Sequence, residues 1–171
     1  MMMGLTMIQE AAKRAQINEE HVHAHERWFG ISADQGGDDW AVAAGLNPFI
    51  VVSGDSDFGT AIKVLGPDDT PAVIRRVRYD AHRIVVATLD HTTVYVLRLI
   101  WGDDAEVAEA AGDYSDMYLI NDVSKANTAG GVPVPVNMPQ LVVGTKLWAK
   151  VKNATDLSAI DFYIGIHEYD T

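Results

Sequence analysis

Lys146-Leu-Trp-Ala-Lys-Val-Lys-Asn153 and Ala159-Ile-Asp-Phe-Tyr-Ile-Gly-Ile-His-Glu-Tyr169, both within the stretch Leu141 to Tyr169, decide the fold class of this chain. In both segments apolar residues alternate with charged, polar or aromatic ones: Leu147, Ala149 and Val151 in the first, and Ile160, Phe162, Ile164 and Ile166 in the second. Alternate residues of a β-strand lie on the same face. We therefore predict two strands joined by a short polar turn, each with one buried face, and a last strand that closes the core.

The chain before this stretch predicts further short strands. The candidates are Phe49–Ser53, Thr60–Leu65, Val73–Arg78, His82–Leu89, Thr93–Trp101, Tyr114–Ile120, Val132–Met138, Leu141–Val143, Lys146–Val151 and Ala159–His167. Turn-forming residues separate them, among them Gly54-Asp55, Gly66-Pro67, Tyr79-Asp80 and Asp90-His91. Many short strands at this spacing are typical of an all-β, antiparallel sandwich or barrel.

Residues 82–89 and 92–101 form the clearest predicted hairpin. Both faces of these two segments are apolar, which indicates strands that are covered on both sides. Residues 105–112 fit either one helical turn or a continuing strand, and 121–131 are rich in the residues of a long loop.

The N-terminal part has a helical pattern. Thr6 and Gln9 fit a capping box, and Asn18 can cap a second helical stretch that runs through His25 toward Trp28 and Phe29. A polar, Gly-rich segment follows up to Trp40. We predict an N-terminal helical arm and linker (residues 1–40) and a β-sandwich domain (residues 41–171). A short helix with a thin apolar stripe must pack against its own domain or another subunit.

Composition limits the function classes. The chain of 171 residues has a net charge of −11, which argues against nucleic acid as a partner, because phosphate binding needs clustered Lys and Arg. Without cysteine there is neither a disulfide framework nor a thiolate metal site. We find no signal peptide and no membrane span, and expect a protein made in a cytoplasm, in which the sequon Asn153-Ala-Thr155 is a chance match.

His21, His23 and His25 are the one cluster that suggests a metal. On a helix His21 and His25 lie one turn apart, and on a strand all three share a face. No third or fourth ligand has a defined spacing, whereas tetrahedral sites need three or four convergent ligands. An exposed polar helix is the favoured interpretation, and we expect no metal and no cofactor.

Other candidate motifs do not complete a catalytic site. The segment Val52-Ser-Gly-Asp-Ser-Asp-Phe-Gly59 lacks the second glycine of a nucleophile elbow and the ligand order of an EF-hand, so a turn between strands is favoured. The acidic pairs Asp38-Asp39, Asp68-Asp69 and Asp103-Asp104 could bind Ca²⁺ only if their loops converged. His82, His91 and His167 fit structural or surface positions. We therefore expect no enzymatic activity.

Five segments together resemble a group of tailed-phage virion proteins: His23-Ala-His-Glu-Arg-Trp-Phe-Gly30, Leu65-Gly-Pro-Asp-Asp-Thr-Pro71, Tyr79-Asp-Ala-His-Arg-Ile84, Lys146-Leu-Trp-Ala149 and Asp161-Phe-Tyr-Ile-Gly-Ile-His-Glu-Tyr169. The resemblance implies an N-terminal helical arm followed by a jelly-roll domain. It also implies a decoration, cement or turret-like role on the capsid, commonly as a trimer.

Two hypotheses follow. The first is a structural virion protein that contacts itself and the major capsid protein and binds neither nucleic acid nor membrane; its expected assembly contacts are Ile8, Ala12, Val22, Trp28, Phe29, Tyr163 and Tyr169. The second is a β-sandwich that binds a ligand, either carbohydrate through Trp and Asp side chains or a metal through the three histidines.

Overall fold

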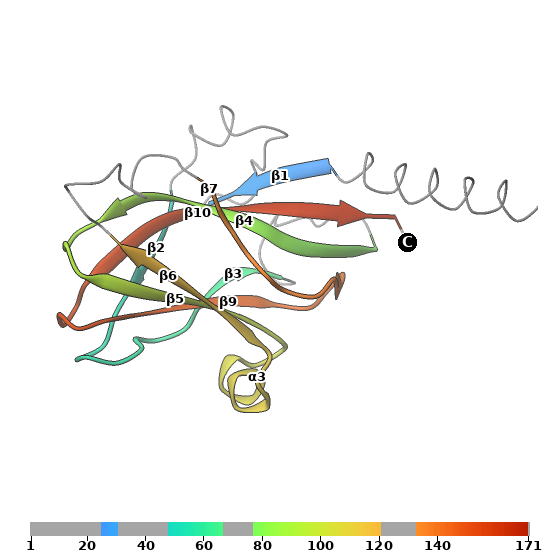
Figure 1. Ribbon diagram of the computed structural model, residues 1–171. Helices are drawn as coiled ribbons and strands as arrows, with labels where there is room; N and C mark the ends of the chain where they lie inside the picture. Colours follow the sequence, from blue (N-terminus) through green and yellow to red (C-terminus); the bar gives the residue numbers. More distant parts are fainter. Residues whose placement is uncertain (1–24, 31–47, 67–76, 121–132, 171) are drawn as a thin grey trace, which may run out of the picture.

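The computed structural model describes residues 25–30, 48–66, 77–120 and 133–170, which are mostly β-strand with one short helix (Figure 1). The elements are β1 (His25–Phe29), β2 (Phe49–Val52), β3 (Ile62–Leu65), β4 (Arg78–Leu89), β5 (Val94–Trp101), α3 (Ala105–Ala111), β6 (Tyr114–Ile120), β7 (Pro133–Pro135), β8 (Leu141–Val142), β9 (Leu147–Asn153) and β10 (Ala159–Tyr169). The predicted helix after Thr6, the Gly-rich linker and the loop at 121–131 lie outside these ranges, so the boundary at residue 40 stays a prediction.

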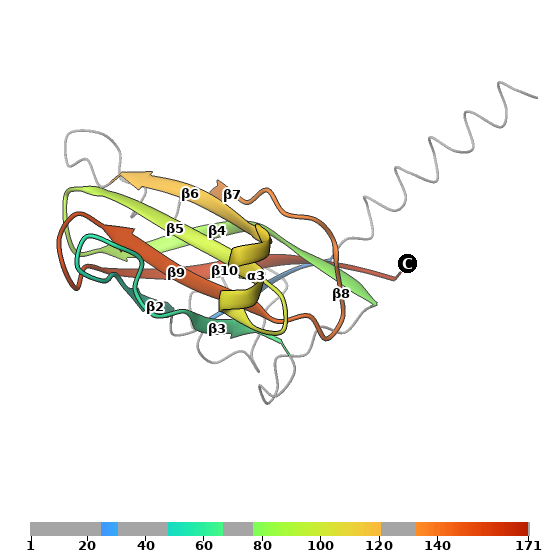
Figure 2. The same ribbon diagram turned by 90° about the horizontal axis from the view of Figure 1, so that it is seen from below.

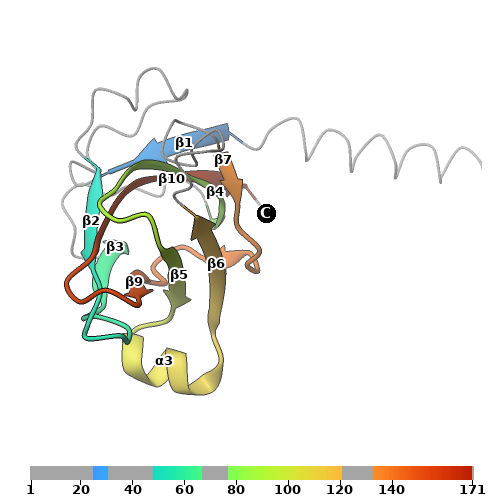
Figure 3. The same cartoon turned by 60° about the vertical axis from the view of Figure 1, so that its left-hand side comes forward.

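The strands form two antiparallel sheets. Sheet A has the order β1-β10-β4-β7, with β2 also paired to β10 and β8 also paired to β4. Sheet B has the order β3-β9-β5-β6. Figures 1 and 3 show the two sheets as layers that face one another, with α3 beyond the outer surface of sheet B.

The strand β10 organises sheet A. Its first residues pair with β2, its later residues pair with β1, and nearly its whole length pairs with β4. Register shifts at Asp161/Phe162 and at Gly165/Ile166 interrupt the ladder with β4. Such bulges increase the local twist of a long strand, which helps sheet A to curve over sheet B.

The inward side chains of both sheets form one hydrophobic core. The predicted apolar faces are confirmed, because Ile160, Phe162, Ile164 and Ile166 of β10 and Leu147, Ala149 and Val151 of β9 are fully buried. Burying an apolar side chain of this size stabilises the fold by roughly 1.5–3 kcal/mol. The two segments that suggested an all-β protein therefore supply facing halves of its core.

The predicted helix through Trp28 and Phe29 is wrong for His25–Phe29, which form strand β1. The partners of Arg27, Trp28 and Phe29 are Ile166, Gly165 and Ile164 of β10. Helix propensity is a weak preference that tertiary pairing overrides. These five residues belong to sheet A rather than to an arm.

The predicted hairpin of residues 82–89 and 92–101 is also wrong, although its strands exist. β4 lies in sheet A and β5 in sheet B, and β9 and β10 are divided in the same way. The turn after β4 crosses between the sheets, where Asp90 accepts hydrogen bonds from the hydroxyl of Tyr95 in β5 and from the backbone N–H of Ala159 in β10. Alternation predicts a strand and its buried face, but it does not say which sheet the strand joins.

Tyr79 and Asp80 do not form the predicted turn, because both lie inside β4. The Tyr79 ring is fully buried, and its hydroxyl donates a hydrogen bond of 2.6 Å to the carbonyl oxygen of Thr145. A local Tyr-Asp pair is a weak turn signal, and the pairing with β10 overrides it.

The segment after β5 is helical rather than a continuing strand. The Asp104 carboxylate caps α3 by accepting hydrogen bonds from the N–H groups of Glu106 and Val107, and Gly112 ends the helix with a positive φ of 86°. Figure 2 shows α3 crossing the outer surface of sheet B in front of β5 and β9.

Candidate functional surfaces

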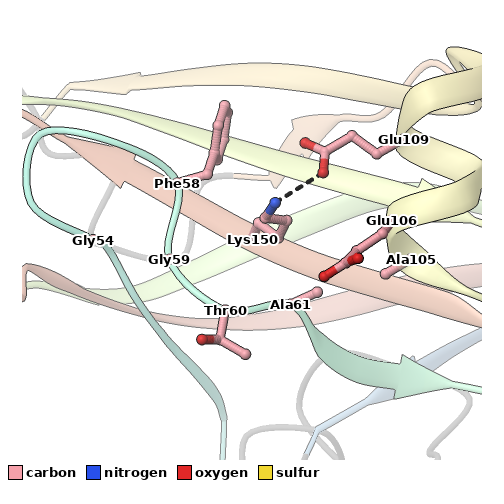
Figure 4. A pocket seen from close by; sticks show the side chains of 9 residues that line it. All are labelled: Gly54, Phe58, Gly59, Thr60, Ala61, Ala105, Glu106, Glu109 and Lys150. Carbon is pink, nitrogen blue, oxygen red and sulfur yellow. Dashed lines mark hydrogen bonds and ion pairs between the residues drawn. The ribbon is translucent and has the colours of Figure 1, made fainter.

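A pocket of about 370 Å³ opens between α3 and the segment that joins β2 to β3 (Figure 4). Its lining residues are Gly54, Phe58, Gly59, Thr60, Ala61, Ala105, Glu106, Glu109 and Lys150. The hollow lies wholly among described residues, on the side of sheet B that α3 covers. A site for a small ligand would be sought here first.

Charged groups beside the pocket pair with one another. Arg98 of β5 donates to both carboxylate oxygens of Asp116 on β6 at 2.7 Å, and to Glu109 of α3 at 2.7 Å. The Lys150 ammonium of β9 donates to the other Glu109 oxygen at 2.8 Å, as Figure 4 shows. We call Arg98, Glu109, Asp116 and Lys150 the Arg98 cluster; it ties α3 to three strands of sheet B.

The cluster holds its members in their charged forms. Burial opposes the ionised form of Glu109, but the hydrogen bonds from Lys150 and Arg98 outweigh it, and the pKa of Glu109 lies below its ordinary value. The hydrogen bond to Asp116 raises the pKa of Arg98. A group that stays charged throughout the pH range around neutrality is poorly suited to exchange protons with a substrate.

Aromatic rings already cover the guanidinium of Arg98. It lies 4.3 Å from the ring centroid of Phe58 and 3.8 Å from that of Tyr114. Lys150 and Lys152 also approach the Phe58 ring, at 5.7 and 6.0 Å. A sugar that stacked on Phe58 would have to displace these cation–π contacts, so the pocket is better suited to joining α3 to the sheet than to receiving a sugar.

The segment that resembled a nucleophile elbow is a structural turn. The hydroxyl of Ser53 donates to the carbonyl oxygen of Thr155 at 3.2 Å and accepts from the N–H of Ser158 at 3.0 Å. Ser53 is buried. Asp57 accepts a hydrogen bond from the N–H of Phe58, which is the first cause that lowers its pKa, followed by the charge of Lys152. The prediction of a turn between strands is confirmed here.

Of the six histidines, the structure describes the backbone of His25 and the positions of His82, His91 and His167. His21 and His23 lie outside the described residues, and His25 pairs through its backbone with Glu168. On the outer surface of sheet A the rings of His82 and His167 stack with centroids 4.0 Å apart, and His167 Nδ1 lies 3.9 Å from Asp80. In the ranges described, no three His, Asp or Glu side chains gather closely enough to hold a metal ion.

Two further sequence candidates have structural roles. The Asn153 side chain is buried, and its oxygen accepts hydrogen bonds from Thr93 Oγ1 at 2.9 Å and from the N–H of Thr155 at 2.7 Å. An amide in this position is not accessible for glycosylation. Of the acidic pairs, Asp103-Asp104 lies at the start of α3, where Asp104 is the cap; the other two pairs are outside the described ranges.

The expected assembly contacts in the described ranges are mostly buried within the single chain. Phe29 lies in the core, while Trp28 and Tyr163 pack with Val85 in a separate cluster. This separate cluster uses the side chains of β1, β4 and β10 that alternate with the core residues, so it lies on the outer side of sheet A. Tyr169 is half-buried and donates a hydrogen bond of 2.8 Å to Asp80. Ile8, Ala12 and Val22 fall outside the described residues.

Exposed apolar side chains gather instead on the outer side of sheet B. Tyr118 and Ile120 of β6 are 71% and 54% exposed, and Val94 of β5, which pairs with Ile120, is 49% exposed. Val96 pairs with Tyr118 between them. We call Val94, Val96, Tyr118 and Ile120 the sheet B patch. β6 is an edge strand of sheet B, so its outward side chains have a neighbouring strand, β5, on one side only.

Sequence reasoning missed both the Arg98 cluster and the sheet B patch. A signal for each was present. Arg98 is the one charged residue in the segment Val94–Trp101, and Tyr118 and Ile120 occupy the side of their strand opposite to Met117 and Leu119. The burial of Met117 and Leu119 could be foreseen, but not the exposure of Tyr118 and Ile120, which depends on β6 being an edge strand.

A buried ion pair lies at the end of the core. Arg27 Nη1 of β1 is 3.3 Å from a Glu168 oxygen of β10, and both side chains are almost fully buried. Removing one partner of a buried ion pair typically costs about 3–5 kcal/mol, because the other charge is left without compensation. This pair links the first described strand to the last one.

Comparisons with protein-family models, curated proteins and solved structures found no match to this chain. No helix in the described ranges is long and apolar enough to cross a membrane.

Proposed function

We propose that this chain is a structural protein of a tailed-phage virion, made in the host cytoplasm, which decorates or stabilises the capsid as a homo-oligomer, most simply a trimer. The major capsid protein is the partner of this proposal, and the chain takes part in no reaction. The proposal rests on the resemblance of five sequence segments to phage virion proteins and on the apolar sheet B patch.

We also propose that the two sheets form a jelly roll. When β2 and β8, which lengthen sheet A, are set aside, the remaining eight strands can be renumbered in chain order from 1 to 8. Sheet A then has the order 1-8-3-6 and sheet B the order 2-7-4-5. This interleaving of strands between two sheets supports a jelly roll, a fold built from two Greek keys that is frequent in capsid proteins.

The observation that carries the assembly role is the sheet B patch. Tyrosine, valine and isoleucine stand together on the outer side of an edge strand, where monomeric proteins usually place charged residues. Contiguous exposed apolar side chains of this kind mark protein–protein contacts. In this proposal a second copy of the chain covers the sheet B patch.

Light scattering on the purified chain tests this role. The wild type is expected to form an oligomer, and Tyr118→Asp to shift the mass toward the monomer, because a carboxylate would be desolvated in the contact. Val107→Asp is the matched control, since Val107 on α3 is also 71% exposed but lies away from the patch. A wild type that stays monomeric at high concentration would contradict the self-association.

Mass spectrometry of purified virions tests the location. The chain should be detected at a fixed ratio to the major capsid protein after the particles have been washed in high salt. Its absence from washed particles would remove the virion role while leaving any self-association intact.

A module that binds carbohydrate or metal is the second candidate. The observation that favours it is the pocket beside α3 (Figure 4), whose lining includes the polar residues Glu106 and Thr60; a sugar there would have to bind without stacking on Phe58, whose ring already contacts Arg98. Melting curves of the untagged chain with zinc, calcium or simple sugars test it, because a ligand that binds the folded state raises the melting temperature. Unchanged melting with all of them would remove this candidate.

A further inference from the structure

Three valines lie exposed at one end of sheet A. Val77 precedes β4 and is 53% exposed, and Val142 and Val143, in and after β8, are 57% and 47% exposed. The backbone joins them, because the N–H of Val143 donates to the carbonyl oxygen of Val77 at 2.9 Å and Val142 pairs with Arg78. By strand alternation Val77 and Val143 lie on one side of the sheet and Val142 on the other, so the three form an apolar rim around the end of the sheet, which we call the valine rim.

Strand β1, the first described element, begins at this same end of sheet A. His25, the first residue of β1, pairs with Glu168, which pairs with Tyr79, which pairs with Leu141 next to the valine rim. Neighbouring strands are about 4.8 Å apart, so this row of four strands spans roughly 14 Å. Figure 1 shows the start of β1, the start of β4 and the C-terminus at one end of the molecule.

The segment before β1 is long enough to reach such a surface on a neighbour. It contains the 24 residues that precede His25. A helix of that length would span roughly 36 Å, at about 1.5 Å per residue. Its sequence has a narrow stripe of small apolar residues, Ile8, Ala12 and Ala15, which suits a shallow surface formed by valines.

From these observations we propose that the valine rim is the docking surface for the N-terminal segment, residues 1–24, of a neighbouring copy of the chain. The inference rests on the proposed function, in which copies of the chain form a homo-oligomer, and it adds a second contact between copies, made by the arm.

The direction of β1 and the exposure of the rim favour a neighbour over the same chain. His25, the first residue of β1, pairs with Glu168 close to the end of β10, so β1 begins at this end of the sheet. In the single chain the three valines are each about half exposed. A second copy that places its arm across them would remove this apolar surface from water, at about 25 cal/mol for each Å² buried.

Cysteine cross-linking tests the inference, because the natural chain contains no cysteine that could give a background reaction. Full-length Ala12→Cys chains are mixed with full-length Val143→Cys chains, one of them tagged so that mixed dimers differ in size. Mild oxidation should give mixed disulfide dimers. Ile8→Cys and Val77→Cys provide a second pair of positions in case either of the first substitutions disturbs folding.

Thr88→Cys is the control for the receiving surface. Thr88 is exposed on the same strand, β4, but lies ten residues from Arg78, which is roughly 33 Å along the strand. Ala12→Cys chains should form few mixed dimers with Thr88→Cys chains. Equal cross-linking to both positions would show random collision and overturn the inference.

The double variant Ala12→Cys/Val143→Cys distinguishes an arm that docks on a neighbouring copy from an arm that docks on its own chain. Covalent dimers and higher species are expected from an arm that docks on a neighbour. A disulfide confined to single chains, with no mixed dimers in the first experiment, would overturn the inference in favour of the chain's own arm. The proposed function fails separately: an oligomeric chain that cross-links as expected but is absent from washed virions would refute the virion role alone.

Discussion

Replacing Gly59 with alanine should destabilise the fold strongly, because a neighbouring strand occupies the space of a Cβ atom. An ideal Cβ at Gly59 would lie 1.9 Å from the carbonyl oxygen of Val52, whereas ordinary contacts begin at 3.4 Å. The backbone would therefore have to move by about 1.5 Å, the difference between these two distances. The N–H of Gly59 donates to the carbonyl oxygen of Val151 at 3.0 Å, and a shift of that size would break this bond.

The expected loss combines two effects. Overpacking costs about 1–3 kcal/mol, and a backbone donor left without its partner costs about 1–3 kcal/mol. We expect Gly59→Ala to lower the free energy of unfolding by roughly 2–6 kcal/mol, a large part of the roughly 5–15 kcal/mol that a domain has. Urea titration followed by tryptophan fluorescence measures it, since the chain has four tryptophans.

Gly144→Ala is the matched control for Gly59→Ala. Nothing lies within 4 Å of a Cβ at Gly144, but its φ of +98° is unfavourable for alanine, so only a conformational cost of about 1–2 kcal/mol is expected. If Gly59→Ala lost no more stability than Gly144→Ala, the steric argument would be refuted.

Glu109→Gln should lower stability by roughly 1.5–3 kcal/mol at neutral pH, as expected for hydrogen bonds to a charged group. Folding lowers the pKa of Glu109, so the loss of stability in the variant should be complete above about pH 5. As the pH falls through the folded-state pKa of Glu109, wild type and variant should become equally stable. A loss of stability that persists in acid would contradict this prediction. Burial, followed by the hydrogen bond to Asp90, raises the pKa of Tyr95 to about 12. The stability that this shift contributes is full below the ordinary tyrosine pKa near 10 and is lost as the pH rises toward 12, so denaturant titrations in alkali should show a shallower decline for Tyr95→Phe than for wild type. Asn153→Ala removes three hydrogen bonds and should lower the free energy of unfolding, measured by urea titration, by roughly 1.5–4.5 kcal/mol; a neutral result would show that water replaces the amide.

The strands and their buried faces could be predicted from the sequence because alternation is a local property. Tyr114–Ile120 was predicted with its observed bounds, and the buried positions of β9 and β10 follow from their alternation alone. Turn residues placed some of the breaks for the same reason, as at Asp90-His91, but Tyr79-Asp80 lies inside a strand. Sequence patterns of this kind depend only on neighbours along the chain.

The sheets could not be predicted, since they depend on contacts between distant residues. The assignment of β4 and β5 to different sheets follows from the crossing held by Asp90, which meets Ala159 far along the sequence. β1 has a helical pattern of its own and becomes a strand only beside β10. A truncated chain that begins near Asp39 would therefore lose a strand of sheet A, and a deletion meant to remove only the arm has to stop before His25.

The Arg98 cluster and the sheet B patch escaped prediction for a related reason. The cluster joins residues of different elements: Arg98 of β5, Glu109 of α3 and Lys150 of β9. They meet only because α3 folds back over sheet B. The exposure of Tyr118 follows from the position of β6 at the sheet edge.

The place of β10 in sheet A has a consequence for biosynthesis. β10 is the last of the described strands to leave the ribosome, yet β1 and β2 pair with it and β4 has its longest ladder with it. β5 and β6 pair with each other and can do so early, whereas sheet A cannot be completed until β10 has been synthesised. During that wait the apolar sides of β4 stay open to chaperones or to neighbouring nascent chains. Completion of sheet A therefore depends on the strand made last among those described, and the interval before β10 emerges is the stage at which nascent copies are most exposed to misassembly.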